Sequence, residues 1–210
     1  MNRGTIKTLC IIDNCSFINE SIRFIMRHDE VTFHNLHYAD CEKLMSYNLY
    51  QSNFDEIIIS VYSYKQLAVI DKILSCKNDM KLVVIVYDER SQMLKLLLSL
   101  GVRFIVSHYD SMSRLNNAIK NKNLDCFITP RFYCTIKKFE QDYVLDLKNS
   151  LVTGKPILTK RERRIIISLL SGYSTWDLSK KFNCSIKTVS AHKINALKKL
   201  RERSINKFFL

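Results

Sequence analysis

Short runs of β-branched and other apolar residues alternate with amphipathic stretches through the first 125 residues of the chain. The runs predict five strands, at Thr8 to Ile12, Val31 to Leu36, Glu56 to Val61, Leu82 to Tyr87 and Phe104 to Ser107. The stretches beside them predict helices at Phe17 to Arg27, Asp40 to Leu49, Tyr64 to Ser75, Arg90 to Leu100 and Met112 to Lys120. This alternation is typical of an α/β domain with a doubly wound, five-stranded parallel sheet.

The C-terminal part of the chain shows helical spacing alone. Thr159 and Glu162 predict a capping box, which begins a helix with Ile165, Ile166, Leu169 and Leu170 on one face. Ser174 repeats the cap for a second helix over Thr175 to Phe182, Ser185 caps a third from Ile186 to about Leu200, and Arg203 to Phe209 form a fourth. The short turn between the second and third helices predicts a helix-turn-helix within an all-α, four-helix domain.

Both prolines lie between these two parts. Pro130 after Thr129 predicts a helix that continues over Arg131 to Phe139, and Asp146 to Pro156 is typical of a linker. The sequence therefore predicts the α/β domain at 1–125, a connector with a short helix and a linker at 126–154, and the helical domain at 155–210.

Net charge divides the chain at nearly the same place. The whole chain has 33 Lys and Arg against 20 Asp and Glu, a formal charge of +13. Residues 150–210 hold 14 of the basic side chains and 3 of the acidic ones, which leaves 19 and 17 for residues 1–149. A net +11 on the small domain indicates a surface that neutralises phosphates, so we expect double-stranded DNA as a partner. A merely solvated basic face is the alternative, and an anionic membrane surface is a weaker third one, because no continuous aromatic and leucine face lies opposite the basic residues.

The sequence gives little support for an enzyme, a metal-binding protein or a membrane protein. No P-loop, GxGxxG, HExxH or GxSxG motif occurs, and the seven cysteines contain no CxxC pair. We therefore expect no enzymatic activity, no cofactor and no metal. The apolar runs, such as Leu82 to Val86, are far shorter than the roughly 20 residues of a membrane span. We expect a cytoplasmic protein with no membrane partner.

The segment Leu9-Cys10-Ile11-Ile12-Asp13-Asn14 resembles the first strand of a response-regulator receiver, a flavodoxin-like domain. That family has an acidic pair there, a nucleophilic Asp after strand 3, a Ser or Thr after strand 4 and a Lys after strand 5. The corresponding positions here are Asp13 and Asn14, then Ser60 (or Tyr62 if the register slips by two), then Val86 or Tyr87, then Ser107 or His108. With one carboxylate missing and no Asp nucleophile, the resemblance implies a pseudo-receiver that takes no phosphate.

A second resemblance rests on Leu158-Thr159-x-Arg161-Glu162, Gly172-x-Ser174, Leu178-Ser179-x-x-Phe182, Ser185-x-x-Thr188-Val189-x-x-His192 and Lys199-Leu200. These motifs resemble the DNA-binding domain of the LuxR/NarL-type, FixJ-like response regulators. Ser185 to Lys193 is most similar to the Rcs capsule-regulator branch of that family. This branch includes auxiliary members with degenerate receivers, which act by pairing with a phosphorylatable partner.

The third predicted helix is the one that enters the DNA major groove in that family. Val189, Ala196 and Leu200 share an inward face, which leaves the opposite side for DNA. The resemblance implies base-edge contacts from Ser190, Ala191 and Ile194, and phosphate contacts from Lys187, Thr188, Lys193, Lys198 and Lys199. Asn195 lies on the same outward side, and His192 is expected to pack partly inward and to reach a phosphate. Ala191 and Ile194 have a plain alternative as ordinary surface residues.

The two resemblances together imply a transcription regulator that works without phosphorylation and pairs with an Rcs-type response regulator. RNA polymerase is a further expected partner. The alternative is a stand-alone homodimeric LuxR-type factor controlled by abundance or a small ligand. In the family the fourth helix is the usual dimerisation surface, but Phe208 and Phe209 could equally close the small core.

Overall fold

The computed structural model describes residues 7–38, 54–75, 80–110, 112–121 and 124–209 of the chain. Its sheet contains β1 (Lys7–Ile12), β2 (Val31–Leu36), β3 (Glu56–Val61), β4 (Lys81–Val86), β5 (Phe104–Ser107) and β6 (Phe127–Ile128). The strand order is β2-β1-β3-β4-β5-β6, and each neighbouring pair is parallel. The predicted α/β class and all five predicted strands are confirmed. The strand count of five is wrong, because β6 adds a two-residue strand beside β5.

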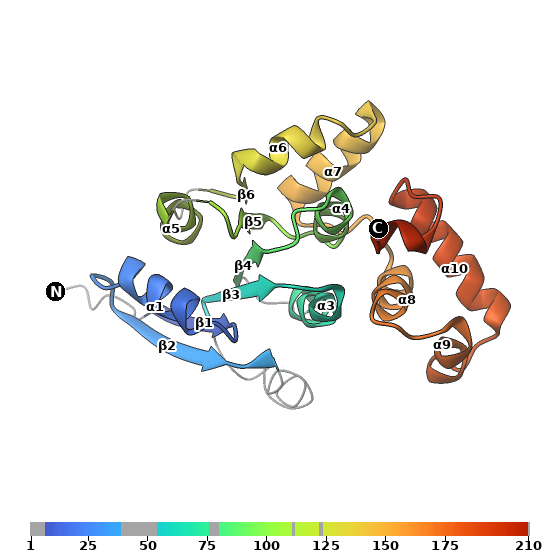
Figure 1. Cartoon of the computed structure of the whole chain (residues 1–210), viewed down its shortest axis with the longest axis horizontal. Coiled ribbons are helices and arrows are strands. Elements are labelled where there is room, and N and C mark those ends of the chain that lie inside the picture. Colours follow the sequence, from blue (N-terminus) through green and yellow to red (C-terminus); the bar gives the residue numbers. More distant parts are fainter. Residues whose placement is uncertain (1–6, 39–53, 76–79, 111, 122–123, 210) are drawn as a thin grey trace.

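Helices cover both faces of the sheet (Figure 1). On one face, α1 (Ser16–Ile25) and α5 (Met112–Lys120) bury their apolar sides against Leu9 and Ile11. On the other, α3 (Leu67–Ser75), which follows the 3-10 helix η1 (Tyr64–Gln66), and α4 (Ser91–Ser99) pack against Cys10 and Ile12. Successive side chains of a strand point to opposite faces, so both faces of this sheet are apolar. The helix predicted at Asp40 to Leu49 lies outside the described residues.

The predicted connector is mostly part of the α/β domain. It forms β6, α6 (Pro130–Ile136) and α7 (Gln141–Thr153), and α7 packs on α4. Phe132, Tyr143 and Leu147 are fully buried there. The predicted linker at Asp146 to Pro156 is therefore wrong over most of its length, because α7 continues to Thr153 and ends at Gly154 in the left-handed region, with φ +65°. The helix at Pro130 is confirmed, but it ends at Ile136.

The C-terminal domain contains α8 (Lys160–Leu170), α9 (Thr175–Lys181) and α10 (Ile186–Lys199). The predicted N-caps are confirmed: the side chains of Thr159, Ser174 and Ser185 each accept a hydrogen bond from the backbone N–H three residues on. The fourth helix is shorter than predicted and is not α-helical, because it is the 3-10 helix η2 (Ile205–Phe208). The domain therefore has three α-helices and one 3-10 turn.

The two domains share one apolar core. Ile166, Ile167 and Leu170 of α8 and Phe208 of η2 lie in the same buried cluster as the inner sides of α3 and α4. The helix-turn-helix keeps a small core of its own, made of Ile165, Leu178 and Val189. The apolar stripe of α8 thus divides between two cores, and α8 holds the helix-turn-helix against the α/β domain.

Polar contacts fix the orientation of this joint. Arg163 Nε donates to Asp71 Oδ1 of α3 at 2.5 Å, and the two side chains expose only 10% and 11% of their surface. Lys95 of α4 pairs with Glu202 at 2.5 Å. The Tyr64 hydroxyl donates to the carbonyl of Phe208 at 2.7 Å, and burial raises the pKa of Tyr64 to about 12, which keeps it a donor. These contacts need specific partners and therefore favour one arrangement of the domains.

Replacing Asp71 with Asn should lower the free energy of unfolding by about 3 kcal/mol, because Arg163 keeps its charge in a buried position without a carboxylate beside it. Asn is nearly the same size, so the change tests charge and not packing. Urea unfolding of the full chain, followed by circular dichroism, measures the effect. The control is Asp125→Asn at an exposed position, which should cost less than about 0.5 kcal/mol. Equal losses for the two variants would contradict a structural role for the ion pair.

Candidate nucleic-acid interface and receiver pocket

The predicted DNA-reading side of α10 is open to solvent. Its inward residues Val189, Ala196 and Leu200 are fully buried, as the helical spacing predicted. The expected contact residues lie on the other side: Lys187, Thr188, Ala191, Ile194, Asn195 and Lys198 are exposed, and Ser190, His192, Lys193 and Lys199 are half-buried. We call these ten residues the α10 face. Helix α8 lies between α10 and α3 (Figure 1), and the exposed residues of the α10 face lie where α8 and α9 leave α10 uncovered.

Two large apolar side chains of this helix are exposed to solvent. Ile194 exposes 48% of its surface, and Ile186 at the first turn of α10 exposes the same fraction. Ile186 was not among the predicted contacts, although it immediately precedes Lys187. A branched apolar side chain left in water beside lysines is suited to contact a thymine methyl group. The α10 face therefore offers both apolar and cationic groups.

Helix α9 adds a basic and aromatic surface that the sequence reading missed. Lys180 Nζ lies 3.4 Å from the ring centroid of Trp176, and Lys181 Nζ lies 4.5 Å from that of Tyr173. Both rings are about half exposed. The spacing of four residues between Trp176 and Lys180 on one helix is the signal that could have predicted the first pair.

One predicted phosphate contact has a partner inside the domain. Lys199 Nζ lies 2.8 Å from Glu162 Oε2, which also accepts the backbone N–H of Thr159 at 2.8 Å. Burial alone would raise the pKa of Glu162, but the hydrogen bonds from Lys199 and Thr159 outweigh it and hold that pKa below its usual value. Lys199 is thus charge-compensated at neutral pH and ties the end of α10 to the start of α8.

The residues expected to form a degenerate receiver pocket, which we call the receiver pocket, begin at the carboxyl ends of β1 and β3. Asp13 is almost fully buried and accepts hydrogen bonds from the Ser60 hydroxyl, from the Tyr62 hydroxyl at 2.6 Å and from the backbone N–H of Cys15 at 2.7 Å. Asn14 instead accepts from the backbone N–H of Tyr38 at 3.2 Å. The oxygens of Asp13 are therefore engaged by protein donors.

Aromatic rings fill the rest of this pocket. The ring of Tyr62 lies 4.2 Å from that of Tyr87, which stacks on His108 at 3.8 Å. Burial is the main cause that raises the pKa of both tyrosines, and the hydrogen bond to Asp13 raises that of Tyr62 further, so both hydroxyls stay protonated. Val86 points into the core, so of the two predicted positions after strand 4 only Tyr87 reaches the pocket.

The residue set does not fit the Mg²⁺ ion that a receiver holds. Mg²⁺ needs a near-octahedral shell of oxygen ligands, including carboxylates. Here Asp13 is already occupied by three donors, and Ser107 donates to Glu89, which pairs with Arg131 at 3.2 Å. Among the residues that the structure describes, no three His, Cys, Asp or Glu side chains gather as a metal-binding group.

An α/β domain with a receiver topology, joined to a capped helix-turn-helix, defines a response-regulator-like DNA-binding protein. Residues 156–208, about a quarter of the chain, match the family model of bacterial regulatory proteins, luxR family. The C-terminal domain is therefore a luxR-family helix-turn-helix domain. The resemblance predicted from its motifs is confirmed.

Solved structures of a response regulator support the whole architecture. The chain is similar to RcsB of Salmonella enterica serovar Typhimurium bound to a promoter with the phosphomimetic BeF3⁻, at a TM-score of 0.55 and 19% identity over 98% of this chain and 97% of that one. It is also similar to another structure of the Salmonella typhimurium RcsB response regulator, at a TM-score of 0.53 and 18% identity over 97% and 100% of the two chains. At this identity the likeness shows the fold. No helix in the described ranges is both long and apolar enough to cross a membrane.

Replacing Lys187 with Ala should weaken binding to all DNA sequences and lower the slope of log K against log salt by about one unit, because one phosphate contact and its released counterion are lost. Fluorescence anisotropy with a labelled duplex at several salt concentrations measures both quantities. Lys148→Ala, at an exposed position on α7, is the matched control and should leave the slope unchanged. A Lys187 variant with the wild-type slope would exclude this residue from the interface.

Proposed function

We propose that the protein is a transcription regulator that binds double-stranded DNA through the α10 face and uses its receiver-like domain without phosphorylation. Ser190, Ala191 and Ile194 read base edges, with Ile186 beside them. Lys187, Thr188, Lys193 and Lys198 contact phosphates, and Asn195 and His192 lie within the same footprint. Lys199 is secondary because it is paired with Glu162. A protein with this role works in the cytoplasm, where it meets DNA and RNA polymerase.

One observation carries the phosphorylation-independent part of the proposal: protein groups occupy the receiver pocket. The hydroxyls of Ser60 and Tyr62 donate to Asp13, where a receiver has free carboxylates. Neither residue is a carboxylate, so an acyl phosphate cannot form at this position. In this proposal, hydrogen bonds and ring stacking stabilise the conformation of the receiver-like domain, and no phosphoryl group is needed for it.

Incubation with acetyl phosphate and Mg²⁺ should leave the intact mass of the protein unchanged, because the pocket lacks an acyl acceptor. A response regulator with an intact Asp nucleophile, treated in the same tube, is the positive control. The Tyr62→Phe variant tests whether the missing nucleophile or the blocked Asp13 prevents phosphorylation. It frees one oxygen of Asp13 but supplies no carboxylate nucleophile, so this variant should also stay unmodified. A stoichiometric phosphate adduct on the wild-type protein would overturn the proposal.

We further propose that the protein acts as an auxiliary subunit that pairs with an Rcs-type response regulator. The α/β domain offers an apolar surface that supports pairing: Phe17 and Phe24 of α1 expose 71% and 60% of their surface. A spacing of seven residues places both on one side of the helix. The second candidate is a homodimer with its own DNA site, and the same exposed face is compatible with it.

Affinity purification of the tagged protein from its native cells, after nuclease digestion, should recover a second LuxR-type regulator with an intact phosphorylation site. The digestion removes neighbours that share only the same DNA. Substitution of Phe24 by Ser should reduce the recovered partner, because an apolar contact is lost, whereas Leu145→Ser on α7, equally exposed at 60%, is the control. Recovery of the tagged protein alone at the mass of a dimer would favour the homodimeric regulator.

A further inference from the structure

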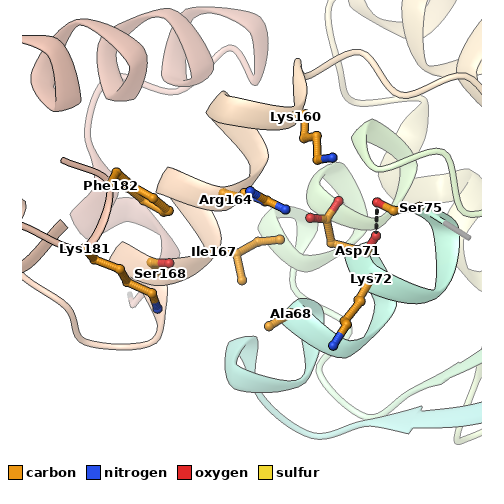
Figure 2. A pocket seen from close by; sticks show the side chains of 10 residues that line it. All are labelled: Ala68, Asp71, Lys72, Ser75, Lys160, Arg164, Ile167, Ser168, Lys181 and Phe182. Carbon is orange, nitrogen blue, oxygen red and sulfur yellow. Dashed lines mark hydrogen bonds between the residues drawn. The ribbon is translucent and has the colours of Figure 1, made fainter. Parts of the chain in front are cut away.

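A groove runs along the joint between the two domains, where α3 meets α8 and α9 (Figure 2). It consists of a cavity of about 400 Å³ and an adjoining one of about 580 Å³. The two cavities share Ala68, Ile167, Ser168 and Lys181 as lining residues, so they lie side by side. Ligand sites commonly have volumes of about 300–1,000 Å³ and lie at domain interfaces. We call this feature the joint groove.

Positive charge converges on the joint groove from both domains. Its lining includes the cationic side chains Lys65, Lys72, Lys160, Arg164 and Lys181. Within the described part of the chain, Lys65, Lys160 and Arg164 form no ion pair with a carboxylate. Like charges gathered in a concave site repel one another, and an anion relieves that repulsion.

The two carboxylates in the lining are engaged elsewhere. Asp71 accepts from Arg163 at 2.5 Å. Asp177 accepts from the hydroxyl and the backbone N–H of Ser174, at 2.6 and 2.9 Å, as part of the α9 cap. These hydrogen bonds hold the pKa of Asp177 below its usual value, so it is ionised and committed to the cap. Among the lining residues that the structure describes, the cations outnumber the two engaged carboxylates, which leaves an excess of positive charge.

The joint groove also has an apolar part. Ala68 and Ile167 face each other across it, and the Phe182 ring lies at its α9 end (Figure 2). Arg164 and Lys160 project from α8 toward α3, on which Lys72 lies. A ligand that satisfies both parts carries several negative charges and a compact apolar or planar portion. Nucleotides and similar phosphorylated metabolites have that chemistry.

DNA itself does not fit this position. Helix α8 lies between α3, which lines the groove, and α10 (Figure 1), and the exposed side of α10 is the one that α8 and α9 leave uncovered. A duplex lying on the α10 face therefore does not also reach the interior of the joint. The charge of the joint groove needs an occupant small enough to enter between α3 and α8.

We propose that the joint groove binds a small phosphorylated metabolite of nucleotide size. Lys160, Arg164 and Lys181 of the helix-turn-helix domain contact its phosphates together with Lys72 of the α/β domain. Because the ligand contacts both domains at once, its binding stabilises their present arrangement. The protein thereby gains a chemical input at the joint that does not use the receiver pocket.

Isothermal titration of the full-length protein with ATP, GTP and inorganic pyrophosphate, at constant ionic strength, tests the site. We expect saturable binding at one site per chain and a higher melting temperature with ligand. Replacing Lys160 and Arg164 together with Gln should raise the Kd roughly tenfold, because two ion-pair contacts are lost. Lys148→Gln is the charge-matched control outside the groove and should bind like the wild type. Melting without ligand verifies that each variant is folded.

The Lys187→Ala variant separates the joint groove from the DNA interface. It should lose DNA affinity and keep nucleotide affinity, whereas the Lys160 and Arg164 double variant should do the reverse. Binding of pyrophosphate as tight as that of ATP still supports the proposal and assigns recognition to the phosphates alone. Three results would overturn it: no saturable binding of any of the three probes, an equal loss of nucleotide binding in Lys187→Ala, or a lower DNA salt slope in the double variant.

Discussion

Burial of α8 on two sides at once is the constraint on which the rest of this structure depends. Ile165 packs into the helix-turn-helix core, while Ile166 and Ile167, one and two positions later, pack into the core of the α/β domain. A helix committed in this way cannot rotate about its axis without exposing one of the two apolar sides. The direction of α10, which packs on α8, is therefore set by contacts on the far side of α8, away from DNA.

Internal contacts also fix the side chains of the receiver pocket. Asp13 carries a buried carboxylate, and neutral donors satisfy it. A buried charge with its full set of hydrogen bonds is stable without a metal, because the donors replace the lost hydration. The ring of Tyr87 lies against that of Tyr62, whose hydroxyl donates to Asp13, and stacks on His108 on its other side. Hydrogen bonds and ring packing thus hold the carboxyl ends of these strands together.

Local signals in the sequence predicted most of the fold, and long-range contacts decide the rest. The N-caps at Thr159, Ser174 and Ser185 were predicted correctly, because an N-cap is a hydrogen bond between residues only three positions apart. The linker prediction failed at α7, where Ser150 interrupts the apolar stripe of Tyr143 and Leu147 yet is buried by donating to the carbonyl of Leu98. The joint groove could not be predicted, since Lys72 and Arg164 meet only after the domains have packed.

The contact between Tyr64 and Phe208 has a consequence for synthesis. The two residues are 144 positions apart, and at translation rates of about 5–20 residues per second the second follows the first by roughly 7–30 seconds. The last strand of the sheet, β6, ends at Ile128, 80 positions before Phe208, so at the same rates the sheet precedes this contact by roughly 4–16 seconds. During that time the side of α3 and α4 that α8 and η2 later cover remains in water. The nascent chain thus presents an apolar surface for seconds, until α8 and η2 have been made.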